Sequence, residues 1–341
     1  MFSGKGHGSR NSPCSSTVNF LALHFVLAAS LLVTGCTVVE HVSIALLYKR
    51  APLPGAQVKF DVPYVDHSLL AKQRLDLFLP KGTNWPVFIF VHGGNWDGSD
   101  KGLRVGGADV YGNIGRFYAA RGIGVAVINY RLQPTVSWRE QVEDVAAATV
   151  WIHAHIAEYG GSPNRIFLGG HSAGAQLACH VALDPGPLAV YGLSPSIVDG
   201  VISVSGAGLD LVDQKTYELG AKRAYYADRF GNKGPREIWQ QEASPVTYVT
   251  SNAPPFLILY AAGESKALQR QSQRLSEVLE REQVPYRLVV VPGQSHARMV
   301  LTLSRPDRTS ADAILDFIYE TVQKNHEVQS VSGLTHVDSG H

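Results

Sequence analysis

The chain alternates apolar runs with amphipathic stretches from Val58 to Lys324. Two leading segments, VKFDVPYV and RLDLFLP, alternate apolar and polar residues and predict strands that are buried on one face. The later runs are continuously apolar, which is typical of parallel strands covered on both faces. These runs are PVFIFVHG (86–93), GIGVAVINYRL (122–132), RIFLGG (165–170), GVISVSG (200–206), PPFLILYAAG (254–263) and YRLVVVPG (286–293).

Helical periodicity fills the intervals between these runs. Strands separated by helices predict an α/β fold with a mostly parallel, doubly wound sheet and helices on both faces. The short turn between the two leading strands predicts an antiparallel edge. Residues 207–245 are more polar, and we expect small helices there that form a partial lid. The predicted helices cover 138–159, a stretch from Ala173, 267–282 and 310–324, with Ser310 as the N-cap of the last.

The N-terminus has the pattern of a targeting segment. Lys5 and Arg10 precede an apolar run from Phe20 to Val33 that is short for a membrane-spanning helix. The run ends in LLVTGC, which resembles the lipobox of bacterial lipoproteins. The resemblance implies that residues 1–35 are a signal peptide and that the thiol of Cys36 carries lipid, so the protein would be exported and anchored to a membrane. An uncleaved anchor and a plain secretory signal are the alternatives.

The rest of the chain divides into a linker at 36–57, one domain at 58–324 and a polar tail at 325–341 that we expect to be disordered. A net charge of +1 provides no field that would attract nucleic acid. Of the three cysteines, Cys14 would leave with the signal and Cys36 would carry lipid. Cys179 then stands alone on an apolar helix, so we predict a core residue and no disulfide framework.

The segment GHSAG, Gly170 to Gly174, lies where a strand becomes a helix and matches G-x-S-x-G. A nucleophile elbow needs small residues around its serine, because the serine backbone is strained and neighbouring chain passes close by. The N-terminus of the following helix also favours developing negative charge. We therefore predict that Ser172 is a nucleophile. A glycine-rich turn that binds phosphate is the alternative, but no G-K-[ST] or G-x-G-x-x-G follows.

A second glycine motif, VHGGNW, follows a buried strand upstream. Paired glycines let backbone N–H groups point into a cavity. When an elbow follows in the chain, such a loop supplies oxyanion donors together with the residue after the nucleophile. The predicted donors are the N–H groups of Gly94, Asn95 and Ala173, and the predicted supporting residues are His92, Gly93 and Trp96.

Four motifs follow one another along the chain, in the order VHGGNW, INYRL, GGHSAGAQLA and GQSH. Over residues 58–324 the chain resembles α/β-hydrolases of the HGG-containing esterase group, related to hormone-sensitive-lipase-like carboxylesterases and to kynurenine formamidases. The resemblance implies the α/β-hydrolase fold with a small or absent lid. It also implies a catalytic triad that acts without a cofactor.

The triad of this fold follows the chain order serine, acid, histidine. His296, in VVVPGQSHARMV, occupies the loop after the last strand, where it would take the serine proton and return it to the leaving group. Glu264 follows FLILYAAG and is the carboxylate of its loop, because Glu277 already lies deep in a helix. It stands where these esterases usually have aspartate. The run ESKALQRQS resembles the formamidase pattern, which also aligns Glu264 with the acid.

Other reactive-looking residues are predicted to be structural. His171, beside the nucleophile, and His180, on the following helix, should point away from the site. No H-E-x-x-H or paired C-x-x-C occurs, so no metal site is predicted. Asp100 and Lys101 are expected to brace the oxyanion loop, and Asp144 to pair with Arg131.

These residues predict a serine hydrolase that cleaves short-chain carboxylic esters of small molecules through an acyl-enzyme. An arylformamidase is the alternative enzyme, supported by ESKALQRQS, although an exported location argues against it. A non-catalytic, membrane-tethered binding module is the alternative from another class. The three triad positions carry competent residues, which favours the enzyme. The sequence predicts no oligomeric state.

Overall fold

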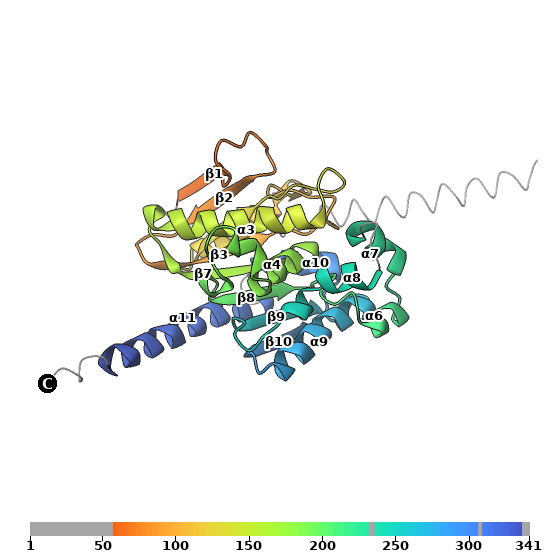
Figure 1. The fold of residues 1–341 in the computed structure, drawn as a ribbon. Helices are drawn as coiled ribbons and strands as arrows, with labels where there is room; N and C mark the ends of the chain where they lie inside the picture. The colour runs from red at the N-terminus through yellow and green to blue at the C-terminus, as the bar shows by residue number, and fades with distance from the viewer. Residues whose placement is uncertain (1–56, 232–235, 306–308, 336–341) are drawn as a thin grey trace, which may run out of the picture. The chain divides into compact units, whose positions relative to one another are not determined.

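A computed structural model describes residues 57–231, 236–305 and 309–335 (Figure 1). The chain divides into two units, of which the larger comprises residues 50–104 and 109–341. The eight-stranded sheet and the helices described below belong to this larger unit. The predicted signal peptide, Cys36 and the linker up to residue 56 lie outside the described residues. No described helix is long and apolar enough to cross a membrane.

An eight-stranded sheet organises the larger unit. Its strands are β1 (Gln57–Pro63), β2 (Arg74–Leu79), β3 (Trp85–Val91), β6 (Gly124–Ile128), β7 (Gly161–His171), β8 (Gly200–Val204), β9 (Phe256–Ala261) and β10 (Tyr286–Val291). Their order is β1-β2-β6-β3-β7-β8-β9-β10. The β1–β2 and β2–β6 pairs are antiparallel, and the pairs from β6 to β10 are parallel. This confirms the predicted parallel sheet with an antiparallel edge. A short ladder pairs β4 (Arg104–Val105) with β5 (Ala108–Asp109).

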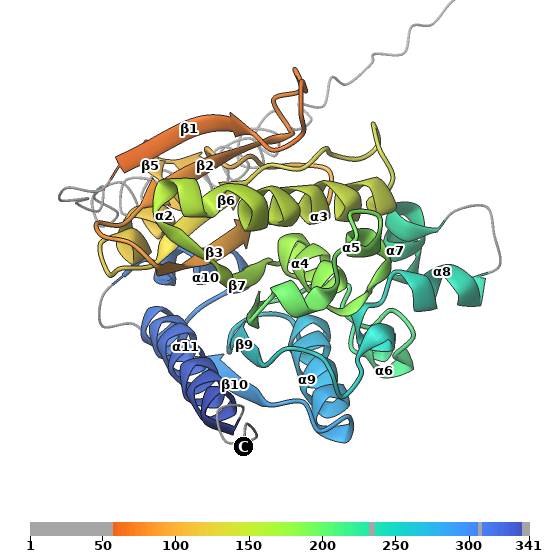
Figure 2. The same ribbon diagram turned by 60° about the vertical axis from the view of Figure 1, so that its left-hand side comes forward.

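Helices cover both faces of this sheet (Figure 2). The helices outside the insert are α2 (Val110–Ala119), α3 (Trp138–His155), η1 (Ile156–Tyr159), α4 (Ala173–Leu183), α5 (Gly186–Ala189), η2 (Pro195–Ile197), α9 (Lys266–Arg281), α10 (His296–Thr302) and α11 (Thr309–Thr335). Ser137 caps α3 through a capping box with Glu140, which explains why the helix begins at Trp138.

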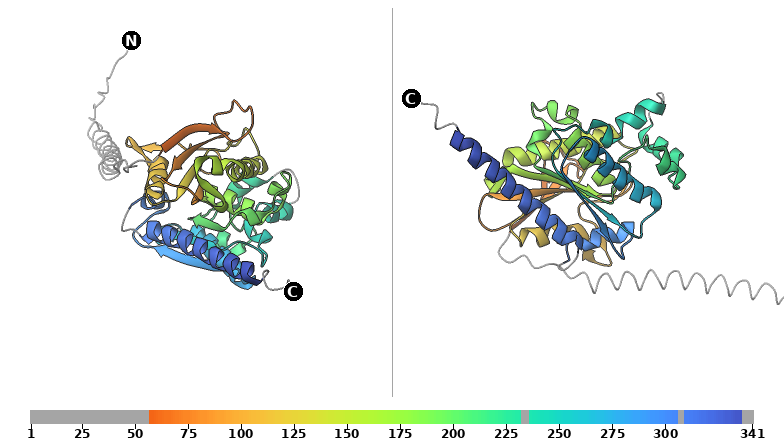
Figure 3. Two further views of the ribbon diagram at one scale, coloured as in Figure 1. Left: turned by 90° about the vertical axis from the view of Figure 1, so that its left-hand side faces the viewer. Right: turned by 90° about the horizontal axis from the view of Figure 1, so that it is seen from below.

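The two faces of the sheet bury different side chains, because successive residues of a strand point to opposite sides. On one face Phe88 of β3 packs edge-to-face on Tyr118 of α2, with 5.9 Å between ring centroids. On the same face Phe167 of β7 packs on Phe317 of α11, which Figure 3 shows crossing the sheet. Leu168, the next residue along, joins the core formed with α3 and α4 on the other face. Burial on both faces explains the continuously apolar runs.

The insert after β8 consists of short helices, as predicted. They are α6 (Gln214–Glu218), α7 (Arg223–Phe230), α8 (Arg236–Glu242) and η3 (Pro245–Tyr248). On α4, Cys179 is fully buried and free, which confirms its assignment to the core.

The last helix differs from its prediction at both ends. α11 begins at Thr309, so Ser310 lies inside the helix, where its hydroxyl donates to Thr302 Oγ1 at 2.6 Å rather than capping the N-terminus. The helix continues to Thr335 and includes residues 325–335, for which the sequence predicts disorder. Residues 325–332 contain neither proline nor glycine, so no strong helix breaker stands before Gly333.

Candidate active site

Ser172 lies at the sharp junction between β7 and α4, with φ 56° and ψ −119°. A positive φ is strained for a residue with a Cβ and is typical of functional sites. A Cβ at Gly170 would lie 2.5 Å from the carbonyl oxygen of Val91, and one at Gly174 would overlap the same oxygen. Both glycines are therefore required because the end of β3 passes directly against the elbow.

The structure brings Ser172, His296 and Glu264 together in one hydrogen-bonded row. His296 Nε2 lies 2.9 Å from Ser172 Oγ, and His296 Nδ1 lies 2.9 Å from Glu264 Oε2. An ionised carboxylate only accepts hydrogen bonds, so Nδ1 carries the proton and Nε2 is left to accept from the serine hydroxyl. This is the arrangement that a nucleophile, its base and an orienting acid require.

Glu264 reaches the row from the turn after β9. Its side chain is completely buried, whereas that of His296 is 29% exposed. The Glu264 backbone is fixed on two sides, since its N–H donates to Ala261 O and its carbonyl accepts from Gln269 Nε2. Among the described residues Oε1 has no hydrogen-bond partner, so the imidazole N–H is the donor that stabilises this buried carboxylate. Glutamate thus reaches the histidine from the position where aspartate is usual.

The loop after β3 lies beside the nucleophile. A Cβ at Gly93 would lie 3.3 Å from Ser172 Cβ. Gly94, Asn95 and Trp96 all have positive φ, at 117°, 55° and 65°. At Gly94 a side chain would also overlap the carbonyl of Gly98, whose N–H donates to Gly94 O and closes a tight turn. The predicted oxyanion residues Gly94 and Asn95 therefore lie on a stretch of positive φ in the loop whose Gly93 is next to the elbow.

His92, which the sequence predicts to be a supporting residue, contacts this loop through its ring nitrogen. Its Nδ1 donates to Gly93 O at 2.6 Å, and its ring stacks on Tyr130 with 4.4 Å between centroids and on Tyr111 with 6.2 Å. Burial lowers the pKa of His92 to about 4. The ring therefore stays neutral near pH 7 and acts as a fixed brace.

Trp96 anchors the far end of the loop. Its indole N–H donates to Gln176 Oε1 at 3.0 Å, and its carbonyl accepts from Gln141 Nε2 at 2.6 Å. The sequence prediction missed both glutamines. The available signal was a glutamine on an otherwise apolar helix face, since Gln141 and Gln176 are each fully buried.

Helix α7 of the insert packs on the same loop. Phe230 lies edge-to-face on Trp96 with 4.8 Å between centroids, and Arg229 pairs with Asp97. Gln133 Nε2 also donates to the carbonyl of Arg229 at 2.9 Å. The insert therefore holds the oxyanion loop as well as bordering the site.

Asp100 and Lys101 tie the end of this loop to the sheet, in agreement with their predicted role. Asp100 accepts from Lys72 Nζ at 2.8 Å and from Asn129 Nδ2 at 2.8 Å. The pKa of Asp100 is lowered to about 2. Burial opposes this shift, and the hydrogen bonds from Lys72 and Gly102 produce it. The ammonium of Lys101 lies 2.6 Å from Asp76 on β2. The predicted pair of Arg131 with Asp144 is also present, at 2.8 Å.

The prediction for His171 is wrong. This ring does not point away from the site: its Nε2 lies 2.9 Å from the backbone oxygen of His296, and the two imidazole centroids are 4.9 Å apart. The direction follows from the turn at Ser172, which points the preceding side chain toward the loop that carries His296.

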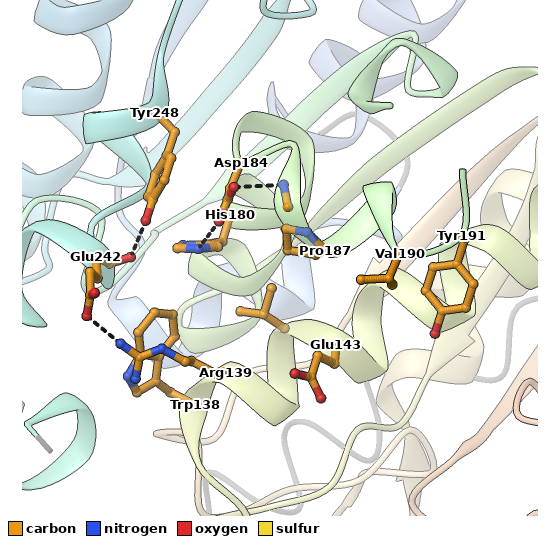
Figure 4. A pocket seen from close by; sticks show the side chains of 12 residues that line it. Trp138, Arg139, Glu143, His180, Asp184, Pro187, Val190, Tyr191, Glu242 and Tyr248 are labelled. Carbon is orange, nitrogen blue, oxygen red and sulfur yellow. Dashed lines mark hydrogen bonds and ion pairs between the residues drawn. The ribbon is translucent and has the colours of Figure 1, made fainter. Parts of the chain in front are cut away.

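His180 does point elsewhere. It lies about two helical turns beyond Ser172 on α4 and lines a cavity of about 440 Å³ together with Trp138 and Tyr248. Figure 4 shows His180 and Asp184 pointing toward one another, with 3.3 Å between Nε2 and Oδ2. Across the described ranges no three His, Cys, Asp or Glu side chains gather as metal ligands.

Comparison with known proteins identifies the family. The BD-FAE family model matches residues 75–279. The chain belongs to the BD-FAE family. This match runs from β2 to α9 and includes the oxyanion loop, the elbow and Glu264.

Individual relatives of this BD-FAE protein have esterase names. It is 28% identical, over 77% of its length and 57% of the relative, to a probable isoprenylcysteine alpha-carbonyl methylesterase of Arabidopsis thaliana. It is 32% identical, over 68% of its length and 58% of the relative, to esterase LipC of Mycobacterium tuberculosis. The chain thus spans less than two thirds of the length of these relatives.

A solved structure confirms the α/β-hydrolase fold. Esterase B from Lactobacillus rhamnosis superposes with a TM-score of 0.68 at 20% identity, over 93% of this chain and 99% of that one. Its likeness therefore concerns the fold, and the predicted sheet with helices on both faces is the fold observed.

The contact between the elbow and β3 can be tested with Gly174→Ala. The added Cβ would overlap the carbonyl oxygens of Val91 and His92, so β3 and α4 must separate. We expect a loss of at least about 2 kcal/mol in the free energy of unfolding and about 10²-fold in ester hydrolysis. Urea denaturation and steady-state kinetics measure these. Gly102→Ala is the control, because its nearest neighbouring atom would lie at 3.4 Å; equal behaviour of the two variants would contradict the role of the contact.

Proposed function

We propose that this protein is a carboxylic ester hydrolase that uses Ser172, His296 and Glu264 as a catalytic triad. The observation that carries the proposal is the row of two 2.9 Å contacts from Glu264 through His296 to Ser172, on a strained elbow beside a glycine loop. The esterase names of relatives from two organisms support the same reaction class.

The proposed acylation step starts from the resting arrangement. Ser172 Oγ attacks the ester carbonyl carbon while its proton moves to His296 Nε2. The imidazolium that forms is stabilised by the carboxylate of Glu264. Negative charge develops on the carbonyl oxygen, and the N–H groups of Gly94, Asn95 and Ala173 would hold it there. Each such donor typically contributes about 10²–10³ in rate.

Collapse of the tetrahedral intermediate completes acylation and prepares hydrolysis. The C–O bond to the alcohol breaks, and His296 Nε2–H protonates the leaving oxygen. A water molecule then takes the place of the alcohol, gives a proton to His296 and attacks the acyl-enzyme. Breaking the bond to Ser172 releases the acid and returns the proton to Oγ, so the cycle needs no other reactant.

For the substrate we propose short acyl esters of small alcohols or sugars. The described insert consists of helices of eight residues or fewer, and α7 is held on the oxyanion loop by Trp96 and Asp97 rather than lying free. We expect helices this short to enclose a short acyl group rather than a long one. The arylformamidase and the non-catalytic binding module are not favoured, because the relatives are named as esterases and the triad residues are in contact.

We also propose that residues 1–35 direct export and that Cys36 is lipidated, on the strength of LLVTGC. The full-length chain, produced in bacteria fed labelled palmitate, should acquire label and sediment with membranes. Cys36→Ala should lose both properties, and Cys14→Ala should retain them, because Cys14 lies before the cleavage point. Label on Cys36→Ala would contradict the proposal.

The nucleophile is tested with Ser172→Ala. Hydrolysis of p-nitrophenyl acetate should fall at least about 10³-fold, and labelling by a fluorophosphonate should vanish, because Ser172 supplies the hydroxyl that is hydrogen-bonded to His296 Nε2. Glu264→Gln should retain labelling at a rate lowered by about 10²–10⁴-fold, because an amide neither orients nor stabilises the imidazolium. Circular dichroism verifies folding, and turnover that survives in Ser172→Ala would refute the assignment.

Acyl preference is measured on p-nitrophenyl esters from C2 to C12. We expect kcat/KM to be highest at C2–C4 and to fall by at least about tenfold by C8, the equivalent of about 1.4 kcal/mol in transition-state binding. Acetylated sugars should be hydrolysed, and N-formylkynurenine should be a poor substrate. A maximum at C8 or above would contradict a short-acyl pocket, and a preference for N-formylkynurenine would support the formamidase.

A further inference from the structure

His171 is a buried imidazole that the triad chemistry does not use. It occupies the position before the nucleophile and is 7% exposed. Its Nε2 lies 2.9 Å from the backbone oxygen of His296, and its ring lies beside the His296 ring at an interplanar angle of 40°. It is thus the residue of β7 that contacts both the backbone and the side chain of the proposed base.

The protonation state of His171 follows from its partner. A carbonyl oxygen only accepts, so the hydrogen of the neutral ring must be on Nε2. Burial, with a smaller contribution from the neighbouring His296 ring, lowers the pKa of His171 to about 3. A second positive charge would be unfavourable beside the imidazolium that His296 becomes during catalysis. His171 can therefore remain a neutral donor while His296 gains and loses its proton.

The other side of the His171 ring faces the oxyanion loop. A Cβ at Gly93 would lie 3.0 Å from His171 Nδ1 and 3.0 Å from its carbonyl oxygen. The ring therefore fills the space between the loop after β3 and the loop after β10. Removing it would free both loops at the point where they meet Ser172.

His296 is the first residue of α10, so its backbone continues into that helix on one side and is contacted by His171 of β7 on the other. Gly263 N–H donates to Gln294 O, and Ser295 and Ala297 on either side of His296 are exposed. The bond from His171 therefore holds the His296 backbone directly. Because a displacement of about 1 Å in a reacting group costs about 10²-fold in rate, this bond matters for the distance between Nε2 and Ser172 Oγ.

We propose that His171 is a positioning residue, whose Nε2–H holds the backbone carbonyl of His296 so that the imidazole of His296 stays within hydrogen-bond distance of Ser172. The proposal rests on the proposed esterase function. It assigns to His171, the second residue of GHSAG, a function in placing the base in addition to its place in the turn.

Two substitutions at His171 distinguish the effect of its Nε2–H donor from the effect of the space that its ring fills. His171→Phe keeps a ring but removes the hydrogen bond that β7 donates to the His296 carbonyl, and kcat should fall by about 10- to 100-fold with KM changed by less than about threefold. His171→Gln places an amide N–H near the Nε2 position and should stay within about fivefold of the natural protein. A folded His171→Phe with natural kcat would overturn the proposal, as would a His171→Gln as slow as the phenylalanine variant.

The matched control is His153→Phe. His153 Nδ1 donates to the Pro163 carbonyl at 3.0 Å, a bond of the same kind between α3 and the beginning of β7. Pro163 lies about 25 Å along the strand from His171. His153→Phe should therefore keep its kcat even where thermal unfolding shows lost stability. If kcat falls equally in both variants, the effect of His171 is one of general stability and the proposal fails.

A measurement on the natural protein covers the case in which His171→Phe does not fold. Nitrogen NMR of labelled histidine should show one imidazole that stays neutral, with its hydrogen on Nε2, from pH 5 to pH 9, and His171→Gln should remove that signal. A His171 ring that titrates in this range, or carries hydrogen on Nδ1, would overturn the proposal. Ser172→Ala distinguishes failure of the positioning role from failure of the proposed esterase function. If Ser172→Ala is inactive but His171→Phe has an unchanged kcat, only the positioning role is refuted. If Ser172→Ala keeps its activity, the esterase function itself is refuted.

Discussion

The site depends on one close packing contact, in which the end of β3 passes directly against the turn between β7 and α4. The carbonyl oxygen of Val91 occupies the space that side chains at positions 170 and 174 would need. Because the oxyanion loop begins at the next residue, this contact determines where Gly93 and Gly94 lie relative to Ser172. A strained serine, which costs about 1–3 kcal/mol, is tolerated because the packing of three elements determines its backbone.

The sheet and the elbow could be predicted because apolar runs and a G-x-S-x-G segment between strand and helix allow few structural solutions. Glu264 and His296 could be located because each follows its own strand. The direction of His171 could not be predicted, because it depends on a turn and on a loop 125 residues away. The same holds for Gln141 and Gln176, whose partner Trp96 lies on a distant loop. The end of α11 could not be predicted for a local reason, since the polar run Asn325, His326 and Glu327 interrupts the apolar pattern after Val322.

The insert packs on the loop after β3 that contains the predicted oxyanion residues. Phe230 and Arg229 of α7 hold Trp96 and Asp97, and Trp96 in turn is fixed by buried glutamines from α3 and α4. A substitution in α7 would therefore affect the position of the loop that contains the predicted oxyanion donors Gly94 and Asn95.

Three imidazoles surround the proposed reaction centre, and an acceptor-only partner determines the tautomer of each. The Gly93 carbonyl places hydrogen on His92 Nδ1, the Glu264 carboxylate places it on His296 Nδ1, and the His296 carbonyl places it on His171 Nε2. Burial keeps His92 and His171 neutral, whereas His296 is partly exposed and has a carboxylate as its partner. One histidine is thus arranged to carry charge during the reaction, and two are arranged to remain neutral beside it.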